Sequence, residues 1–430
     1  MPYLFLFFAL TLLACSSSKD SDDNREREHN YRLLKAYFYK PELIKKYSSY
    51  EGMEIDAMYE TLHDTLGGWR YTRYHKPDIA QQVIDDTENS DKYYSFGFER
   101  KLESDTLVVN AVYPNSPANS AGLKKHDKLL FANDQSLTGE TAVAYEESDS
   151  VFSANVTFKV LRGEENLTLD AMQKMEVLKP TVYLDSINDV PLIRVTEFTK
   201  NTNDPNGTYQ EFKNALRKIQ GAKTAIIDLR RNPGGSIHHC TAMAAELALP
   251  EKELVYDIVH YYDRTRGNVI DTAHYYAKDF SERNGYGVDI KWILLISRFS
   301  ASCAERFAAA VKASRPESKL IGGVTYGKGI GQYYITTYLK GVAFITAIET
   351  FYPNGEPFHR IGVKPDIKID SIFGQEIYLA ALDAAQDFGL AKRLPIVLKK
   401  LPPERSVRKM EPKAYKEILL HEGEQLDISY

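Results

Sequence analysis

Hydrophobic residues in the second half of the chain follow two alternating patterns. Short continuous apolar runs, as expected for buried strands, are separated by segments whose apolar residues recur at helical spacing. This alternation predicts strand–helix–strand crossovers, and therefore an α/β core with a mostly parallel sheet covered on both sides. The expected strands are 190–198, 224–230, 291–297 and 319–323, with helices at 209–220, 240–249 and 303–314; two strands (331–339 and 342–352) and a helix (375–389) follow.

The first half of the chain has a different pattern. Residues 31–75 place Leu, Tyr, Ile and Met mostly at helical spacings, interrupted by Pro41, Gly67 and Gly68, which predicts a small helical N-terminal region. Residues 93–175 contain short β-type runs separated by Asn, Asp, Ser and Gly. This composition predicts a compact β domain.

The N-terminus reads as an export signal. Residues 1–15, MPYLFLFFALTLLAC, are apolar and are followed by a polar, charged run. An apolar segment this short is typical of a signal peptide, and the polar run is typical of a solvated tether. The alternative is an N-terminal core segment. The sequence LLAC resembles the lipobox of bacterial lipoproteins, which implies cleavage before Cys15 and lipidation of its thiol. We therefore expect a protein anchored by lipid in the bacterial cell envelope, periplasm-facing or surface-exposed.

Charge and cysteine content narrow the possible partners. The 430 residues carry 54 Lys+Arg and 59 Asp+Glu, a formal charge of −5, and neither half has a long run of one sign. Nothing in this balance calls for nucleic acid or an acidic membrane as a partner. Apart from Cys15, the cysteines are Cys240 and Cys303, and the sequence does not decide whether they pair.

A group of candidate nucleophiles lies at 297–312, SRFSASCAERFAAAVK. The strand before it ends at the carboxyl edge of the expected sheet, where α/β proteins bind ligands. A serine just before a helix can face a cleft, and the N–H of Cys303 is placed to stabilise an oxyanion. The alternative is structural: Ser302 and Glu305 also fit a helix capping box.

A serine needs a base to take its proton. His238 and His239 are adjacent on a helix, so both cannot face one site. Lys328, in GGVTYGKGIGQ (322–332), is the more informative candidate, because a lysine in a desolvated cleft can lose its proton near neutral pH. Gly322, Gly327 and Lys328 also fit the start of a phosphate-binding loop, but a strand-like segment follows where that loop needs a helix.

Together, these segments closely resemble the C-terminal processing peptidases, also called tail-specific proteases. That family carries a pattern like S-A-S-A-S-E, followed some distance on by F-G-K-G-x-x-Q. On this pattern Ser302 takes the place of the nucleophile, Lys328 that of the general base and Gln332 that of the residue that orients the lysine. Cys303 then resembles the residue that donates an oxyanion N–H.

The resemblance extends to both sides of these segments. AIIDLRRNPGG (225–235) is similar to the family's L-D-L-R-x-N-x-G-G, whose glycine backbone supplies the second oxyanion donor, here Gly234 or Gly235. FYPNGEPFHRIGVKPDI (351–367) resembles two further elements that are structural in the family. The family implies a ClpP/crotonase-like protease core that needs no metal or organic cofactor.

The β domain resembles a PDZ domain. YYSFGFE (93–99) is similar to the carboxylate-binding loop of PDZ domains, and residues 115–139 are similar to a later stretch of the same domain. A peptide would add as a strand at the sheet edge while the backbone N–H groups of Phe96, Gly97 and Phe98 hold its C-terminal carboxylate. The alternative for the loop is an ordinary hydrophobic strand.

The resemblance implies a serine endopeptidase that acts on polypeptides selected by their C-terminal tails, with an adaptor protein as a further partner. The competing hypothesis is a peptide-binding scaffold that keeps the fold without turnover. Residues 256–290 resemble an insertion near the cleft. The expected organisation is a lipoprotein signal peptide (1–15), a tether (16–30), a helical N-terminal region (31–90), a PDZ-like domain (91–177), a peptidase core (178–400) and a C-terminal tail (401–430).

Overall fold

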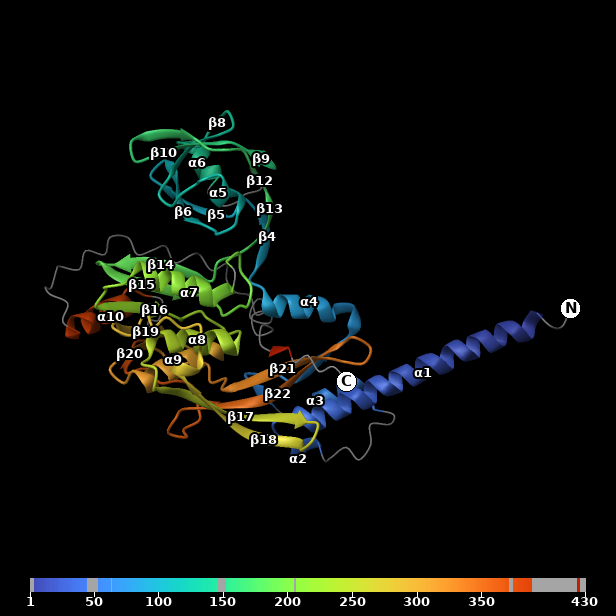
Figure 1. The fold of residues 1–430 in the computed structure, drawn as a ribbon. Coiled ribbons are helices and arrows are strands. Elements are labelled where there is room, and N and C mark those ends of the chain that lie inside the picture. Colours follow the sequence, from blue (N-terminus) through green and yellow to red (C-terminus); the bar gives the residue numbers. More distant parts are fainter. Residues whose placement is uncertain are drawn as a thin grey trace. The chain divides into compact units, whose positions relative to one another are not determined.

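The computed structural model divides the chain into two compact units, each with its own core (Figure 1). The first combines Met1–Thr87, Leu184–Phe198 and Ala215–Tyr430; the second combines Glu88–Tyr183 and Thr199–Asn214. The structure describes residues 4–44, 53–62, 64–145, 152–204, 206–370, 374–388 and 424–425. The expected C-terminal tail therefore lies almost wholly outside the described residues.

One sheet of the first unit is built from the strand–helix alternation seen in the sequence. Its strand order is β14-β15-β16-β19-β20-β23, and the four pairs from β15 to β23 are parallel. Every residue of β16 is buried, as expected for a central strand with both faces covered. The strands are β14 (Val182–Ile187), β15 (Val190–Val195), β16 (Thr224–Asp228), β19 (Lys291–Ile296), β20 (Lys319–Gly322) and β23 (Ile367–Lys368).

The helices that follow these strands match the predicted segments closely. They are α7 (Gly207–Lys218), α8 (Ile237–Leu247), α9 (Cys303–Ser314) and α10 (Glu376–Asp387). α10 packs on the parallel sheet, where Ile377 and Leu382 join a cluster with Ile226 and Ile293. α9 contacts α8, β20 and β17, so it lies between this sheet and a second one.

The second sheet of the first unit is largely antiparallel, with the order β18-β17-β22-β21-β24, and β3 pairs with β22. A mostly parallel sheet is therefore too simple a description of the core. Residues 256–290, interpreted as an insertion, largely belong to the β17–β18 hairpin of this sheet, which keeps pairing from Tyr256 to Asp263. Its strands are β17 (Glu253–Asp263), β18 (Gly267–Tyr276), β21 (Ile330–Thr336), β22 (Val342–Phe351) and β24 (Glu424–Gln425).

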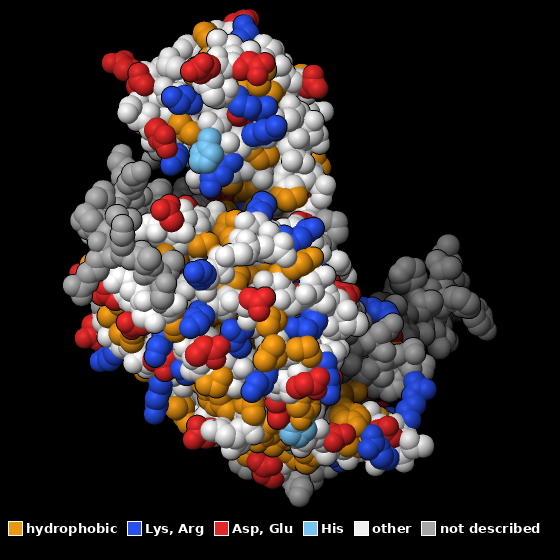
Figure 2. Space-filling view, turned by 60° about the vertical axis from the view of Figure 1, so that its left-hand side comes forward, with side chains coloured by type: hydrophobic (Ala, Val, Ile, Leu, Met, Phe, Trp, Pro, Cys, Tyr) orange, Lys and Arg blue, Asp and Glu red, His pale blue; other side chains and the backbone are white. Residues whose placement is uncertain are grey.

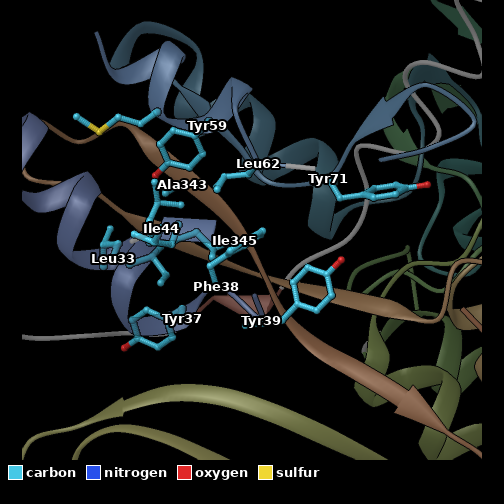
Figure 3. Close-up of a cluster of buried hydrophobic side chains, with 14 of the residues drawn as sticks. Leu33, Tyr37, Phe38, Tyr39, Ile44, Tyr59, Leu62, Tyr71, Ala343 and Ile345 are labelled. Atoms are coloured by element: carbon cyan, nitrogen blue, oxygen red, sulfur yellow. The ribbon is translucent and has the colours of Figure 1, made fainter. Parts of the chain in front are cut away.

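The N-terminal region packs on β22 and is not purely helical. Its elements are α1 (Leu4–Tyr37), α2 (Pro41–Ile44), α3 (Ile55–Glu60), β1 (Thr65–Leu66), β2 (Trp69–Arg70), β3 (Arg73–His75) and α4 (Pro77–Glu88). Figure 3 shows the shared core, in which Phe38, Tyr59 and Leu62 lie close to Ala343 and Ile345. The region is therefore built into the core of the first unit.

Residues 16–30, expected to be a tether, continue the helix α1 instead. Glu26 and Asn30 are buried, because each meets polar partners: Glu26 accepts hydrogen bonds from Leu339 N–H (2.7 Å) and the Tyr74 hydroxyl (2.9 Å). Tyr59 donates to Asn30 Oδ1 (2.7 Å). Among the described residues, no helix has an apolar stretch long enough to cross a membrane.

The second unit is a small β domain. Its main sheet has the order β11-β10-β7-β6-β5, so β5 lies at one edge. Phe96, Phe98 and Phe158 pack together in its core. The strands and helices are β4 (Lys92–Ser95), β5 (Phe98–Glu103), β6 (Thr106–Val112), α5 (Pro117–Ser120), β7 (Lys128–Ala132), β8 (Gln135–Ser136), α6 (Glu140–Ala144), β9 (Asn155–Val156), β10 (Phe158–Arg162), β11 (Glu165–Thr168), β12 (Met172–Gln173) and β13 (Met175–Leu178).

Basic and acidic side chains are interspersed over the face drawn in Figure 2, and neither sign forms a continuous area there. Mixed charge of this kind gives little long-range attraction for a polyanion.

Candidate active site

The turn between β19 and α9 carries the serines singled out in the sequence. Ser300 is fully buried, and its hydroxyl donates to Leu229 O (2.8 Å) and accepts from Ser297 N–H (3.0 Å). The first bond holds the turn against the residue that follows β16, and the second closes the turn on itself. Ser300 is therefore a support for the turn, with its hydroxyl already committed.

Ser302 is held in an unusual backbone conformation. Its φ is 52° and its ψ is −115°, directly before the first residue of α9. A positive φ costs a non-glycine residue about 1–3 kcal/mol and persists only where its surroundings enforce it, often at functional sites. Here the surroundings include Glu305, whose carboxyl accepts the Ser302 N–H at 2.8 Å. The expectation that Glu305 reaches back to the helix start is thus confirmed.

Glu305 also connects Ser302 to the lysine loop. Its Oε2 accepts the Lys328 N–H (2.6 Å) in addition to the Ser302 N–H, and its Oε1 accepts the Gly327 N–H (2.6 Å) and the Thr325 hydroxyl. One carboxyl oxygen therefore holds the backbones of Ser302 and Lys328 next to each other. Burial raises the pKa of Glu305 to about 7, although these hydrogen bonds act in the opposite direction.

Lys328 is almost fully enclosed, with 1% of its surface exposed. Its Nζ donates to Gln332 Oε1 (3.0 Å) and lies 4.4 Å from the centre of the Tyr71 ring. Burial lowers the pKa of Lys328 well below its ordinary value. The charge of Arg73 acts in the same direction, whereas Asp64 and other acidic neighbours oppose it. A lysine in this setting can be neutral and accept a proton near neutral pH.

Cys303 has the properties of a buried, inert thiol. Its Sγ lies 2.7 Å from Sγ of Cys240, both side chains are buried, and both cysteines are free. Burial raises the pKa of the Cys303 thiol well above its ordinary value, and the nearby Cys240 adds to this shift. Because the thiolate is the nucleophilic form, Cys303 is a poor candidate for the attacking group.

The glycine loop after β16 lies against the serine turn. Ala301 N–H donates to Asn232 O (3.0 Å), and Gly234 N–H donates to Asn232 Oδ1 (2.8 Å). Gly234 is therefore already engaged. Gly235 has a φ of 128°, and among the described residues none accepts a hydrogen bond from its N–H. Of the two glycines left open by the sequence, Gly235 has the available donor.

The lysine loop does not form a phosphate-binding loop. Residues 323–329 lead into the strand β21, and the described structure has no helix there whose N-terminus could face a phosphate. The strand expected after Lys328 is present as β21. A phosphate-binding loop would need a helix at this position.

The segment 96–98, which we expect to bind a carboxylate, forms the loop before β5 and the first residue of that strand. Phe96 and Phe98 point into the core, so only their backbone can meet a ligand. Gly97 has a φ of 78°, and a Cβ there would lie 2.2 Å from Cβ of Ser116. Its N–H donates to Ser95 Oγ at 3.1 Å, so this group would have to change partner to hold a carboxylate. β5, which follows the loop, is an edge strand.

Several residues around Lys328 carried no sequence signal. Tyr71 covers the lysine, and Thr72 and Asp64 bond Thr346; all three come from the N-terminal region, whose strand β3 pairs with β22. Thr346 pairs with Gln332 across β21 and β22. A pattern search along one sequence does not connect positions so far apart, whereas Glu305 was visible in the S-x-x-E motif.

Comparison with known proteins identifies the two units. Residues 189–369 match the model of peptidase family S41, and residues 87–172 match that of the PDZ domain. The mixed α/β unit thus matches a peptidase family of known type, and the small β unit matches a PDZ domain. Residues 189–369 are similar to peptidase family S41, and the expected resemblance to the C-terminal processing peptidases is confirmed by this match and by the CtpA-like relatives.

Curated relatives agree with this assignment. A CtpA-like serine protease of Staphylococcus aureus (strain bovine RF122 / ET3-1) is 26% identical over 349 residues, which cover 80% of this chain and 64% of the relative. A CtpA-like serine protease of Staphylococcus haemolyticus (strain JCSC1435) is 25% identical over 84% of this chain and 68% of the relative. The chain thus spans just under two thirds of the length of the S. aureus relative.

Two solved structures are also similar to this chain. The photosystem II D1 C-terminal processing protease is 19% identical, with a TM-score of 0.45 over 81% of this chain and 93% of that one. An S41 protease from Bacteroides fragilis NCTC 9343 is 14% identical, with a TM-score of 0.49 over 83% of this chain and 97% of that one.

Proposed function

We propose that the protein is a serine endopeptidase that cleaves polypeptides with a Ser302/Lys328 dyad. The observation that carries the proposal is the shared oxygen of Glu305, which joins the backbone of a strained serine to that of a buried lysine. A base with a lowered pKa next to a serine at a helix start is the arrangement that serine activation needs.

In this mechanism Ser302 Oγ attacks the scissile carbonyl while its proton passes to Lys328 Nζ, which Gln332 orients. The negative charge that develops on the carbonyl oxygen is held by the N–H groups of Cys303 and Gly235. Lys328 then gives the proton to the leaving amine. In the second half of the reaction, water attacks the acyl-enzyme, Lys328 takes its proton, and Ser302 is regenerated.

The proposed substrates are polypeptides whose C-terminal tails bind the PDZ domain. The support is the edge position of β5 beside Phe96, Gly97 and Phe98, because an extended peptide can add to an unpaired strand edge. An adaptor protein is a further proposed partner. No comparable observation favours the alternative of a scaffold without turnover.

The proposed location is the bacterial cell envelope, with a lipid on Cys15. The support is the apolar segment ending in LLAC. Metabolic labelling with a radioactive fatty acid should label the wild-type chain, and the Cys15→Ala variant should stay unlabelled. Equal labelling of both would contradict the proposed anchor.

Activity tests the dyad directly. The purified protein should degrade casein, an unfolded substrate, and Ser302→Ala and Lys328→Ala should each abolish this while retaining the wild-type circular dichroism spectrum. Activity should fall as the pH is lowered, because a protonated Lys328 cannot accept the serine proton. Degradation of casein by Ser302→Ala would show that the nucleophile is misassigned.

A further inference from the structure

We infer that Asp64 is a positioning residue of the catalytic site: acting through Thr346, it fixes the direction of the Gln332 amide and thereby the hydrogen bond that orients Lys328. The inference rests on the proposed Ser302/Lys328 chemistry. It adds to that chemistry a buried carboxyl from the N-terminal region, in a segment that the protease motifs do not include.

A continuous chain of hydrogen bonds connects Lys328 to Asp64. Lys328 Nζ donates to Gln332 Oε1 (3.0 Å), and Gln332 Nε2 donates to Thr346 Oγ1 (3.1 Å). Thr346 Oγ1 in turn donates to Asp64 Oδ2 (2.5 Å). Asp64 and Thr346 are fully buried and Gln332 nearly so. Bulk water therefore cannot easily substitute for a missing member of this chain.

The direction of these bonds follows from the number of protons available. A threonine hydroxyl has one proton to donate, and an ionised carboxyl only accepts. Once Thr346 donates to Asp64, its oxygen acts only as an acceptor, for Gln332 and for the Thr72 hydroxyl at 2.9 Å, so the NH2 end of the amide faces Thr346. The carbonyl end is then left facing Lys328, where it accepts from Nζ. The acidic side chain thus decides which end of Gln332 meets the lysine.

The N-terminal region holds both Asp64 and its partner Thr346 in place. Thr72 donates to the same Oδ2 of Asp64 and accepts the Thr346 N–H at 3.0 Å. On the other side, Tyr39 N–H donates to Thr346 O at 2.9 Å. The segment that carries Asp64 and Thr72 is therefore attached to the backbone of β22 at the residue opposite Gln332. This attachment explains why the region is part of the peptidase core.

Asp64 also acts on Lys328 through its charge. The carboxyl favours the protonated lysine, as Glu305 and Cys303 do, whereas Arg73 opposes them. Tyr71 covers the Nζ, and His359 lies near enough for Lys328 to lower its pKa. Removing the charge of Asp64 should therefore lower the pKa of Lys328 further. Asp64→Asn should therefore have two separable effects. One is on the direction of the Gln332 amide, and the other is on the pKa of Lys328.

The test is Asp64→Asn in the full chain, assayed with fluorescently labelled casein and with a fluorophosphonate that labels an activated serine. The asparagine can donate as well as accept, so Thr346 can reverse its bond and Gln332 can turn its NH2 toward Lys328. We expect kcat to fall by about tenfold or more, on the scale of losing one oriented hydrogen bond to a charged group, with little change in KM. The pH midpoint of the acid limb should move to lower pH.

Two further variants separate positioning from general damage. Thr346→Ser keeps the hydroxyl and should retain nearly wild-type kcat, whereas Thr346→Val, of similar size, should lose activity as Asp64→Asn does. Asp56→Asn changes an exposed acid of the same region and should leave kcat and the pH midpoint unchanged. Thermal unfolding of each variant reports whether it is folded.

The outcomes distinguish the possible errors. An Asp64→Asn protein with wild-type kcat and an unshifted midpoint would overturn the inference. So would an unshifted midpoint combined with equal losses in Thr346→Ser and Thr346→Val, because a purely structural role predicts that pattern. If the wild type itself neither cleaves casein nor reacts with the fluorophosphonate, the proposed function fails, and the inference fails with it.

Discussion

At the scale of single residues, burial and hydrogen bonding decide which of the candidate nucleophiles is available to attack a substrate. Ser300 has committed its hydroxyl to the turn, and Cys303 is a buried thiol beside another thiol. Ser302 occupies a strained position next to the loop of a buried lysine. From the local sequence alone, Ser302 fits a helix cap and Cys303 is the best nucleophile of the three, whereas burial and hydrogen bonding favour Ser302.

Cys303 is expected to be dispensable for catalysis except through its backbone. Cys303→Ala should keep activity within about threefold of the wild type, since the variant retains the N–H and loses only a small buried side chain. Iodoacetamide should leave the native enzyme active, because an enclosed thiol with a raised pKa forms little thiolate. Inactivation of the native protein by iodoacetamide would contradict the assignment of Ser302 as the nucleophile.

Gly235 should tolerate no side chain. A Cβ there would lie 2.0 Å from Phe198 O, and the φ of 128° is itself unfavourable for alanine. Gly221 is a matched control, because its φ is 86° and no atom lies within 4 Å of a Cβ built there. We expect Gly235→Ala to lower the free energy of unfolding by about 3 kcal/mol or more and Gly221→Ala by about 1 kcal/mol. Urea unfolding measures both, and equal losses would contradict the role of the close contact.

At the scale of elements, α9 is the part that organises the core. The helix starts at the serine turn, and the buried guanidinium group of Arg306 anchors its first turn. Arg306 donates to Asp257 on β17 (2.5 Å), to Thr350 on β22 (2.9 Å) and to Thr241 on α8 (2.7 Å). The helix therefore holds three other elements around the site through one guanidinium group.

Arg306 is accordingly expected to be important for stability. Arg306→Ala leaves the carboxyl of Asp257 buried without its cation, and losing one member of a buried pair costs about 3–5 kcal/mol. Arg266→Ala is the control, since its pair with Asp263 is at the surface and surface ion pairs contribute little to stability. Thermal unfolding should show a large loss for the first variant and almost none for the second. An equally small loss of stability in both variants would show that Asp257 finds another partner when Arg306 is removed.

At the scale of the whole molecule, the sequence predicted what depends on local pattern. The strands β15, β16, β19, β20, β21 and β22, the helices α7 to α10 and the Ser302–Lys328–Gln332 spacing follow from periodicity and motif, whereas β17, β18 and β23 were not predicted; α9 was predicted at its observed ends, 303–314. The antiparallel sheet, the pairing of β3 with β22 and the contact of Tyr71 with Lys328 depend on long-range packing. No local spacing encodes such contacts. The helix at residues 16–30 is a further example, because Glu26 and Asn30 find their buried partners only in the folded chain.

The division into a protease unit and a PDZ unit leads to a prediction for the full chain. Ser302→Ala, which should bind without cleaving, is expected to bind a peptide with a free C-terminal carboxylate more tightly than the same peptide with a C-terminal amide. The reason is that the N–H groups near Phe96 and Phe98 can satisfy a carboxylate, and charged acceptors form hydrogen bonds about twice as strong as neutral ones. We expect a ratio of about tenfold or more, measured by isothermal titration calorimetry.

The Ser95 hydroxyl provides a second variant for this experiment, because it accepts the Gly97 N–H that a carboxylate would need. Ser95→Ala frees this donor and should tighten binding of the carboxylate peptide while leaving the amide peptide nearly unchanged. Ser153→Ala is the control, since this serine lies in the same unit, is exposed and bonds the Asn155 carbonyl instead. If the two peptides bind equally well in every variant, tail selection cannot operate through the carboxylate. Substrate choice would then have to depend on side chains that pair along the edge of β5.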